Sequence, residues 1–439
     1  MNVLSLALAM NFERFIAREI SRSSQRNFSS FIIKIAIVAV ALSMTVMVIT
    51  SSVITGFKNQ ISSKVFSFWG HIHVTDGNVG STFELVPMVK DQALIDSIIA
   101  IGPTEYIRPT RIGEEENRIV ERTKAGVSEV HPFIVVPGIV SSRNNYEGLL
   151  LKGFDHTSGL DHVTPFIQEG EMIQFSDSLP SRDILLSEQT ARRMNFEVGD
   201  RLIVHFILDE EQVKRAFTVG GIYKTGLEEY DRRFALVDMR ILQQVLAWDP
   251  NMVSGLEIFI DHLPDLSLLN EYIYFEKLPG NLYSESIESK FYQIFEWLEL
   301  QDINEQVIIA LMIIVAIINM ATALLIFVLE RTRMIGILKA LGASNWSIRR
   351  IFLYNAGEII IKGLIAGNLL AFTLCLLQMK TGILKLREQD YYLSEVPIEF
   401  NIPAILYINI GTIVITLLFL VLPSALVSKI DPVKAIQFN

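Results

Sequence analysis

Four stretches of the chain are apolar over the length that an α-helix needs to cross a bilayer. A hydrocarbon core of about 30 Å takes roughly 20 helical residues. Charged side chains are almost absent from these stretches, apart from Lys34 in the first and a pair in the third. The pattern predicts a membrane α-helical fold with four transmembrane helices at residues 31–54, 306–329, 351–377 and 402–427.

The third stretch carries Glu358 and Lys362 one helical turn apart. The acidic residue comes first, which is the favourable order for an ion pair within a helix. We therefore predict that the two side chains neutralise each other inside the span. A role in an ion pathway is the alternative, because ionisable residues within membrane spans are often functional.

Basic residues in the short flanks predict the orientation. Residues 1–30 carry four basic side chains against two acidic ones, and residues 331–350 carry five against none. Lysine and arginine are retained on the cytoplasmic side of a membrane. Both termini, including the tail 428–439, are therefore expected in the cytoplasm. The formal net charge of the whole chain is −10, so the remainder, which faces outward, is strongly acidic.

The N-terminal segment, residues 1–30, predicts an amphipathic helix on the inner leaflet. Phe12, Phe15 and Ile16 lie on one side of such a helix, and arginines repeat every four residues on the other. An ordinary solvated helix is the alternative. A signal peptide is not favoured, because no basic residue precedes the apolar start.

Residues 55–305 predict a large α+β extracytoplasmic domain, with 55–145 and 225–305 nearer the membrane and 146–224 distal. Strands are expected near His71–Val74, within 182–207, at 216–223 and at 256–260. A short helix is expected at Ser187–Asn195, with the serine as its N-cap. Only a short outer loop, residues 380–400, separates the third and fourth spans.

A basic amphipathic segment follows the second span at residues 330–348. Its apolar residues suit a short helix, and Gly342 suits its C-terminal stop. A basic interfacial anchor is one interpretation. The string also resembles the cytoplasmic coupling segment of the ABC permease superfamily that includes the macrolide-exporter and cell-division permeases.

The resemblance is closer to the lipoprotein-releasing permeases of the LolC/LolE type, and it covers nearly the whole chain. The motifs follow in family order, and they are Val53–Lys58, Gly70–Val74, Gly153–Asp155, Ile184–Glu188, Val198–Asp200, Phe217–Gly226, Glu229–Asp231 and Asp431–Ala435. The family's proline-bearing hook for a periplasmic lipoprotein chaperone is replaced here by the short connection Leu208–Arg215. The chain thus resembles the hookless partner, which leaves recruitment of the chaperone open.

The resemblance implies a permease subunit of the bacterial inner membrane that extracts acylated lipoproteins. Its partners would be a dimer of cytoplasmic ATP-binding subunits, a second permease subunit, distinct or identical, the lipoprotein and the bilayer. ATP and Mg would bind to the partner ATPase and no cofactor to this chain. The residues expected to couple to the ATPase are Arg331, Arg333, Gly336, Leu338, Lys339, Leu341 and Gly342.

Acyl chains are expected to meet the apolar faces of the first two spans, where methionine is flexible and polarizable. The residues expected to make this contact are Met44, Met47 and Val48 in the first span and Met312, Ile313 and Ala316 in the second.

Several other classes of function find no support in the residues. No Gly-rich loop ending in Gly-Lys-Ser/Thr occurs, so the chain is not expected to hydrolyse ATP. Cys375 is the single cysteine. All seven histidines fall in the outward domain, and His71 and His73 share a strand face, but a metal site is not favoured because cysteine ligands are absent and such a pair more often just lies on a strand. The acidic exterior argues against nucleic acid. A small-molecule exporter, a mechanotransmitting permease and a membrane-anchored sensor remain as alternatives.

Overall fold

The computed structural model describes residues 28–79, 85–107, 120–142, 145–155, 160–176, 179–208 and 211–429. The predicted N-terminal amphipathic helix and the end of the tail from residue 430 lie outside the described residues. The chain forms two compact units. The helical unit comprises residues 1–59, 297–385 and 395–439, and the α+β unit comprises residues 60–296 and 386–394.

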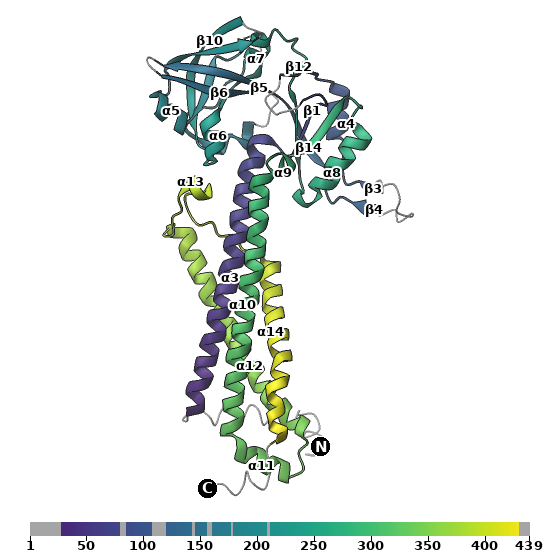
Figure 1. Ribbon diagram of the computed structural model, residues 1–439, viewed down its shortest axis with the longest axis vertical. Coiled ribbons are helices and arrows are strands. Elements are labelled where there is room, and N and C mark those ends of the chain that lie inside the picture. Colours follow the sequence, from purple (N-terminus) through teal and green to yellow (C-terminus); the bar gives the residue numbers. More distant parts are fainter. Residues whose placement is uncertain are drawn as a thin grey trace, which may run out of the picture. The chain divides into compact units, whose positions relative to one another are not determined.

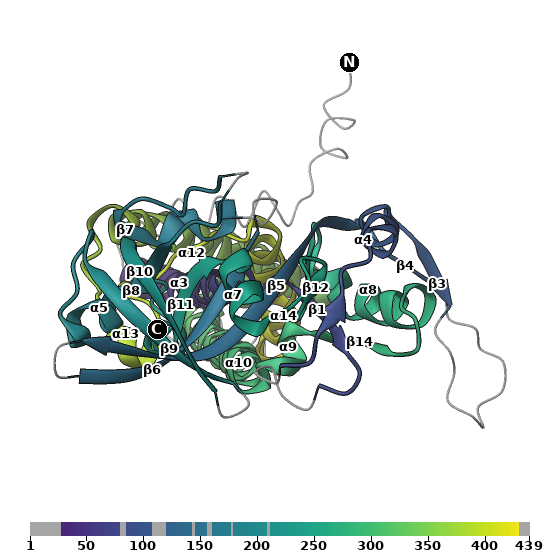
Figure 2. The same cartoon turned by 90° about the horizontal axis from the view of Figure 1, so that it is seen from above.

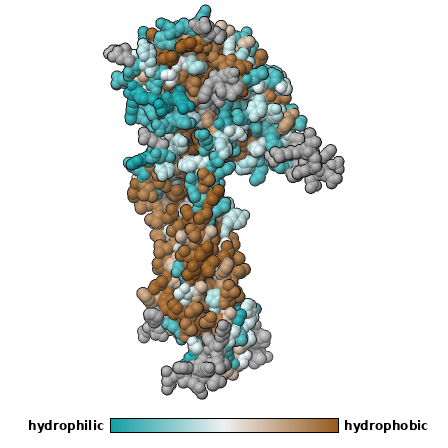
Figure 3. All heavy atoms as spheres, in the orientation of Figure 1, coloured by the Kyte–Doolittle hydropathy of each residue, from teal (hydrophilic) through white to brown (hydrophobic). Residues whose placement is uncertain are grey.

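Four helices within the described residues are long and apolar enough to cross a membrane, which confirms the predicted number. They are α3 (Phe28–Trp69), α10 (Tyr292–Glu330), α12 (Asn345–Thr381) and α14 (Ile402–Ser424) (Figure 1). Helix α14 is followed by a 3-10 turn at Ala425–Lys429. Hydrophobic side chains cover most of the visible surface of the helical unit (Figure 3).

Helices α3 and α10 run well past the predicted spans. The expected first span ends at residue 54, whereas α3 continues to Trp69 and ends before Gly70, whose φ is +71°. Likewise α10 begins at Tyr292, fourteen residues before the predicted start. Hydropathy predicts only the part of a helix that suits lipid. No proline interrupts α3 after residue 54 or α10 before residue 306, so both helices continue. Helix α3 ends where Gly70 adopts a left-handed conformation.

The α+β unit is built on one mixed sheet of ten strands. Its order is β14-β1-β13-β5-β6-β11-β8-β10-β7, and β9 pairs with β10 and β5. The strands are β1 (Ile72–Asp76), β5 (Val127–Ser142), β6 (Asn145–Phe154), β7 (Ile167–Gly170), β8 (Asp183–Ser187), β9 (Arg201–Leu208), β10 (Glu211–Tyr223), β11 (Phe234–Asp238), β13 (Gly255–Ile260) and β14 (Leu282–Ser286). The long strand β5 belongs to both halves of the sheet (Figure 2).

Short helices and two small sheets complete this unit. The helices are α4 (Gln92–Ile99), α5 (Glu188–Met194), α6 (Glu228–Arg233), α7 (Met239–Leu246), α8 (Leu266–Tyr272) and α9 (Ile287–Lys290). The small sheets pair β2 (Met88–Val89) with β12 (Met252–Val253) and β3 (Glu105–Ile107) with β4 (Val120–Arg122). The α+β prediction is confirmed, together with the strands expected near residues 72, 184, 202, 217 and 256.

The predicted helix after β8 is also confirmed, together with its serine N-cap. Ser187 Oγ accepts a hydrogen bond from Thr190 N at 3.0 Å, and Asn195 ends the helix with a φ of +57°. The division into 55–145 with 225–305 and 146–224 stays a prediction. Strand β11 lies after residue 225, and it pairs in parallel with β6 and antiparallel with β8, both of which precede that residue.

A fully buried charge cluster holds the carboxyl end of α3 against the sheet. Lys152, on β6, is 0% exposed, and its Nζ lies 2.7 Å from Glu257 Oε1 on β13. The same ammonium donates to the carbonyl of Phe68 and lies 4.5 Å from the centre of the Trp69 ring. A cation at this position satisfies a terminal carbonyl of the helix and interacts favourably with its dipole.

His73, on β1, completes this cluster as a neutral side chain. Lys290 Nζ lies 2.9 Å from His73 Nδ1, and an ammonium only donates, so Nδ1 accepts. The proton therefore sits on Nε2, which donates to Trp69 O at 2.8 Å. Burial, with the nearby Lys290 charge, lowers the pKa of His73 to about 4. Burial likewise lowers the pKa of Lys290 to about 8.

Glycines allow α12 to pack directly on α3 in the helical unit. A Cβ added at Gly363 would lie 2.7 Å from Val40 Cγ1, and one at Gly367 would lie 2.6 Å from Ala41 O. Thr45 Oγ1 uses the same approach to donate to Gly367 O at 3.1 Å. Small residues permit such contacts between transmembrane helices, and interhelical hydrogen bonds strengthen them.

A matching polar contact joins α12 to α14. Asn368 Nδ2 donates to Asn409 Oδ1 at 2.8 Å, and Asn409 Nδ2 donates back to Asn368 Oδ1 at 3.3 Å. The predicted pair within α12 is confirmed, because Lys362 Nζ lies 2.6 Å from Glu358 Oε1. Both side chains of that pair remain about half exposed.

We expect acidification to lower the stability of the α+β unit through His73. The folded chain binds this proton near pH 4, whereas the unfolded chain binds it near the ordinary value of 6.5. Between these two pH values the unfolded state binds more protons than the folded state. Acidification therefore lowers the free energy of unfolding by up to about 3 kcal/mol through this residue. Urea unfolding of the full chain in detergent, followed by tryptophan fluorescence across this pH range, measures the effect. His73→Gln should weaken the pH dependence, and His205→Gln, on β9, should leave it unchanged; equal curves for all three proteins contradict the prediction.

We expect Gly367→Ala to destabilise the helical unit, because the new methyl group would press on the backbone of α3. Overpacking of this kind costs about 1–3 kcal/mol. Gly411→Ala is the matched control on α14, since a Cβ there meets nothing within 4 Å. The thermal midpoint of the detergent-solubilised chain should fall for Gly367→Ala and stay equal or rise for Gly411→Ala. Equal midpoints for the two variants would refute the close packing.

Candidate functional site: the segment between α10 and α12

The predicted coupling segment forms its own short helix, α11 (Thr332–Ala340), set between two long ones. Helix α10 ends at Glu330, and Gly342 turns the chain with a φ of +93°. Ser344 then caps α12 by accepting from Ser347 N at 3.2 Å. The left-handed φ explains the glycine, because other residues adopt it at a cost. The helix and its stop are therefore confirmed.

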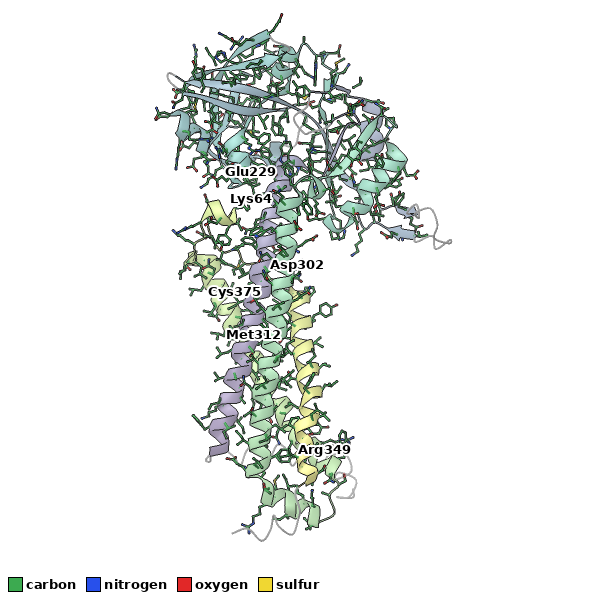
Figure 4. All side chains as sticks on the ribbon, viewed as in Figure 1. Lys64, Glu229, Asp302, Met312, Arg349 and Cys375 are labelled. Atoms are coloured by element: carbon green, nitrogen blue, oxygen red, sulfur yellow. The ribbon has the colours of Figure 1, made fainter. Side chains whose placement is uncertain are left out.

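One face of α11 is fastened to the helical unit. Ile335 is fully buried, Gly336 is buried, and Leu338 packs against the hydrophobic core of the bundle. Lys339 Nζ donates to Ser428 O at 3.3 Å, and Arg349 Nη2 donates to Ser428 Oγ at 2.5 Å. Arg349 is labelled near the start of α12 (Figure 4). These contacts link α11 and α12 to the 3-10 turn that follows α14.

The other face of α11 exposes large apolar side chains. Leu341 is 79% exposed and Ile337 is 46% exposed, one turn apart. Trp346, at the start of α12, is 50% exposed, and the guanidinium of Arg350 lies 5.6 Å from the centre of its ring. Arg333 is also exposed. An apolar surface with a basic rim suits a protein partner better than water.

The structure therefore divides the seven predicted coupling residues. Arg333, Leu341 and Gly342 are exposed, Arg331 is half-buried, and Gly336, Leu338 and Lys339 face or contact the bundle. Ile337, Trp346 and Arg350 belong to the exposed surface and were not predicted. Ile337 and Leu341 lie four residues apart, but Met334 and Leu338, which pack against the core, have the same spacing, so spacing alone does not say which face is exposed.

The residues predicted to contact acyl chains lie mostly inside the bundle. Met44, Met47 and Val48 are fully buried, and Ala316 is 1% exposed. Met312, labelled in Figure 4, and Ile313 pack partly buried against the same core. An acyl chain would reach the buried side chains only after the helices separate. The contact itself stays a prediction.

Other side chains of α3 and α10 present the exposed apolar surface. On α3 they are Phe31, Ile35, Val38, Leu42 and Val46, and on α10 they are Val307, Leu311, Ile314, Ile318, Leu325 and Leu329. Successive positions are three, four or seven residues apart, so each set forms one stripe along its helix. An apolar cavity lined by Ile32, Met320 and Phe327 measures only about 20 Å³, which suits about one water molecule and no acyl chain.

The histidines form hydrogen bonds and ring contacts within the α+β unit. His131 Nε2 lies 2.7 Å and His162 Nε2 lies 3.3 Å from Glu129 Oε2. The His162 ring stacks on Phe259 at 4.2 Å. Burial lowers the pKa of His71 to about 4. Among the residues that the structure describes, no three candidate ligands gather as a metal site.

The expected connection Leu208–Arg215 lies largely within the strands. Leu208 pairs with Glu211, and residues 211–215 belong to β10. Whether this subunit recruits a periplasmic chaperone stays open.

Comparisons with known proteins match two successive regions of the chain. Residues 35–261 match the MacB-like periplasmic core domain, which is more than half of the chain, and residues 306–432 match the FtsX-like permease C-terminal region. The lipoprotein-releasing system transmembrane protein LolC of Xylella fastidiosa is 23% identical over 466 aligned residues, covering 100% of both chains. LolE of Haemophilus influenzae is 21% identical, covering 98% of this chain and 100% of its own.

Solved structures with a similar chain trace include the periplasmic region of MacB from Actinobacillus actinomycetemcomitans. It is 11% identical with a TM-score of 0.31, and the match covers 51% of this chain and 91% of that one. The extracellular domain of the transporter YknZ is 12% identical with a TM-score of 0.29, covering 49% and 98%.

The order of the two matched regions agrees with four apolar helices and an α+β unit inserted after the first of them. This chain therefore belongs to the family of permeases that combine a MacB-like periplasmic core domain with an FtsX-like C-terminal region.

Proposed function

We propose that this chain is the permease subunit of an ABC-type complex that extracts acylated lipoproteins from the outer leaflet of the bacterial inner membrane, for delivery to the outer membrane. The observation that supports this class of substrate is similarity to LolC and LolE over essentially the full length of the chains. Separate ATP-binding subunits hydrolyse ATP with Mg, and this chain supplies no catalytic residue.

The substrate explains why such a complex must consume ATP. Each buried CH₂ of a lipid anchor contributes about 0.8 kcal/mol, so a protein with several acyl chains leaves a bilayer extremely slowly. The permease must therefore lower this barrier by mechanical work. The chain needs one surface that receives the work and another that meets the lipid.

The surface that receives the work is the exposed face of α11 with the start of α12. It consists of Arg333, Ile337, Leu341, Trp346 and Arg350. Buried aromatic and arginine side chains commonly carry most of the affinity of protein interfaces. Because the other face of α11 contacts the core and Ser428, movement of this helix would be passed to α12 and α14.

The surface that meets the acyl chains consists of the exposed stripes of α3 and α10. These stripes are apolar over their length and present branched side chains rather than the buried Met44 and Met47. A second permease subunit, distinct or identical, would face the same stripes. Separation of the helices would then bring Met44, Met47, Val48 and Ala316 to the acyl chains.

The basic flanks support a cytoplasmic location for α11 and both termini, and a periplasmic one for the α+β unit. Within the described chain, Arg331, Arg333, Lys339, Arg349 and Arg350 all follow α10 closely, and no acidic residue lies among them. Chaperone recruitment by a long hook between β9 and β10 is not part of the proposal, because Leu208 at the end of β9 already pairs with Glu211 in β10.

We expect Leu341→Asp to abolish binding of the ATP-binding subunits, because it places a charge in the centre of the proposed interface. Loss of a central interface residue typically costs about 2 kcal/mol or more. Copurification of ATPase subunits with the tagged permease, and ATP-driven lipoprotein release from proteoliposomes, should both fall at least tenfold. Ile207→Asp, which changes an exposed isoleucine on β9, is the control for ATPase copurification.

Gly336→Asp is less informative, since Gly336 is buried and the variant would disturb packing. Unchanged release by Leu341→Asp would refute the coupling surface.

A further inference from the structure

The loop between α12 and α14 contributes residues 386–394 to the α+β unit. It contains the short helix α13 (Glu388–Tyr391). Lys224, directly after β10, places its Nζ 2.7 Å from Glu388 Oε2 and 3.5 Å from Glu188 Oε2. Three segments distant in the sequence, α5, the end of β10 and α13, therefore meet at one lysine.

The loop is held at a second point by its backbone. Lys64, on α3 and labelled in Figure 4, donates to Tyr392 O at 3.0 Å. Tyr392 has a φ of +59°, and the next residue, Leu393, is 4% exposed. A Cβ at Gly226 would lie 2.6 Å from Lys64 Nζ and 3.2 Å from Tyr392 O. The loop is thus seated closely on the turn that follows β10.

Asp231 shapes the turn that presents Lys224. Its carboxylate accepts from Thr225 N at 3.0 Å, from Thr225 Oγ1 at 2.8 Å and from Gly226 N at 2.9 Å. The hydrogen bond between Lys224 and Glu388 raises the pKa of Lys224, which keeps the side chain charged. Beside these groups lies a polar cavity of about 330 Å³, which gives the lysine room to move and water access to it.

The exposure of this contact distinguishes it from the buried pair in the core. Lys224, Glu188 and Glu388 are each about one-third exposed, whereas Lys152 is completely buried. Partly exposed ion pairs contribute little and are screened by salt, but they form and break readily. A buried pair is strongly destabilising to break.

We propose that Lys224 is a positioning residue that clamps the loop 386–394 reversibly onto the α+β unit by pairing with Glu388 and Glu188. The clamp ties the FtsX-like region to the MacB-like region at a point other than the continuous helices α3 and α10. It goes beyond the proposed function, since it holds whichever substrate the permease moves.

Hydrogen–deuterium exchange of the full-length permease in detergent tests the clamp through the amides of residues 386–394. Lys224→Glu should raise their exchange about two- to fivefold, the range expected for a partly exposed ion pair. Lys214→Glu, an exposed charge reversal on the same strand β10, should leave the loop unchanged. Exchange of β8 and β11 serves as the check that the variants are folded.

Swapping the charges of residues 224 and 388 distinguishes loss of the ion pair from a general loss of structure. In a Glu188→Gln background, Lys224→Glu should open the loop, and adding Glu388→Lys should restore its protection. Raising the ionic strength to about 1 M, where the Debye length is about 3 Å, should increase exchange of the wild-type loop towards that of Lys224→Glu. Loop exchange that is the same in Lys224→Glu and wild type, or a charge exchange that restores nothing, overturns the clamp.

Discussion

The carboxyl end of α3 depends on one buried cation. Lys152 donates to the carbonyl of Phe68, near the end of this 42-residue helix, and pairs with Glu257 on the sheet. A buried charge is expensive unless it is paired and hydrogen-bonded, and here the carboxylate, the carbonyl and the aromatic rings all supply that compensation. His73 adds a neutral donor to the same helix end. The last residues of α3 belong to the α+β unit, so this cluster fixes the end of the helix against the sheet.

The helical unit follows different physics, because lipid offers no hydrophobic gain for helix association. Its contacts rely on close backbone approach at Gly363 and Gly367 and on the reciprocal amides of Asn368 and Asn409. Helix α11 is attached to this bundle by one face only. An amphipathic helix that is fixed on one side and apolar on the other is a suitable element for receiving force from a partner, and the family match to FtsX-like permeases covers it.

Two ion pairs in the α+β unit show how burial changes the cost of breaking an ion pair. The pair of Lys152 and Glu257 is buried, whereas Lys224 contacts two carboxylates beside a cavity of about 330 Å³. Lysine–carboxylate pairs therefore form both a contact that stays closed and a contact that can open and close. The difference lies in desolvation, which makes breaking the first pair far more costly than breaking the second.

The sequence by itself determined the four spans, the α+β class, the capped helix at Ser187 and the helix–glycine pattern of the coupling segment. These features are local, because hydropathy, strand alternation and capping depend on neighbouring residues. It did not determine that α3 and α10 continue past the lipid-compatible residues, that Met44 and Met47 face inward, or that Ile337 and Leu341 face outward. Nor did it bring Lys152 to the end of α3 or Lys224 to Glu388. Those outcomes depend on which helix face a distant segment covers, and only the tertiary structure decides that, because the pairing of segments far apart in sequence leaves no local periodic signal.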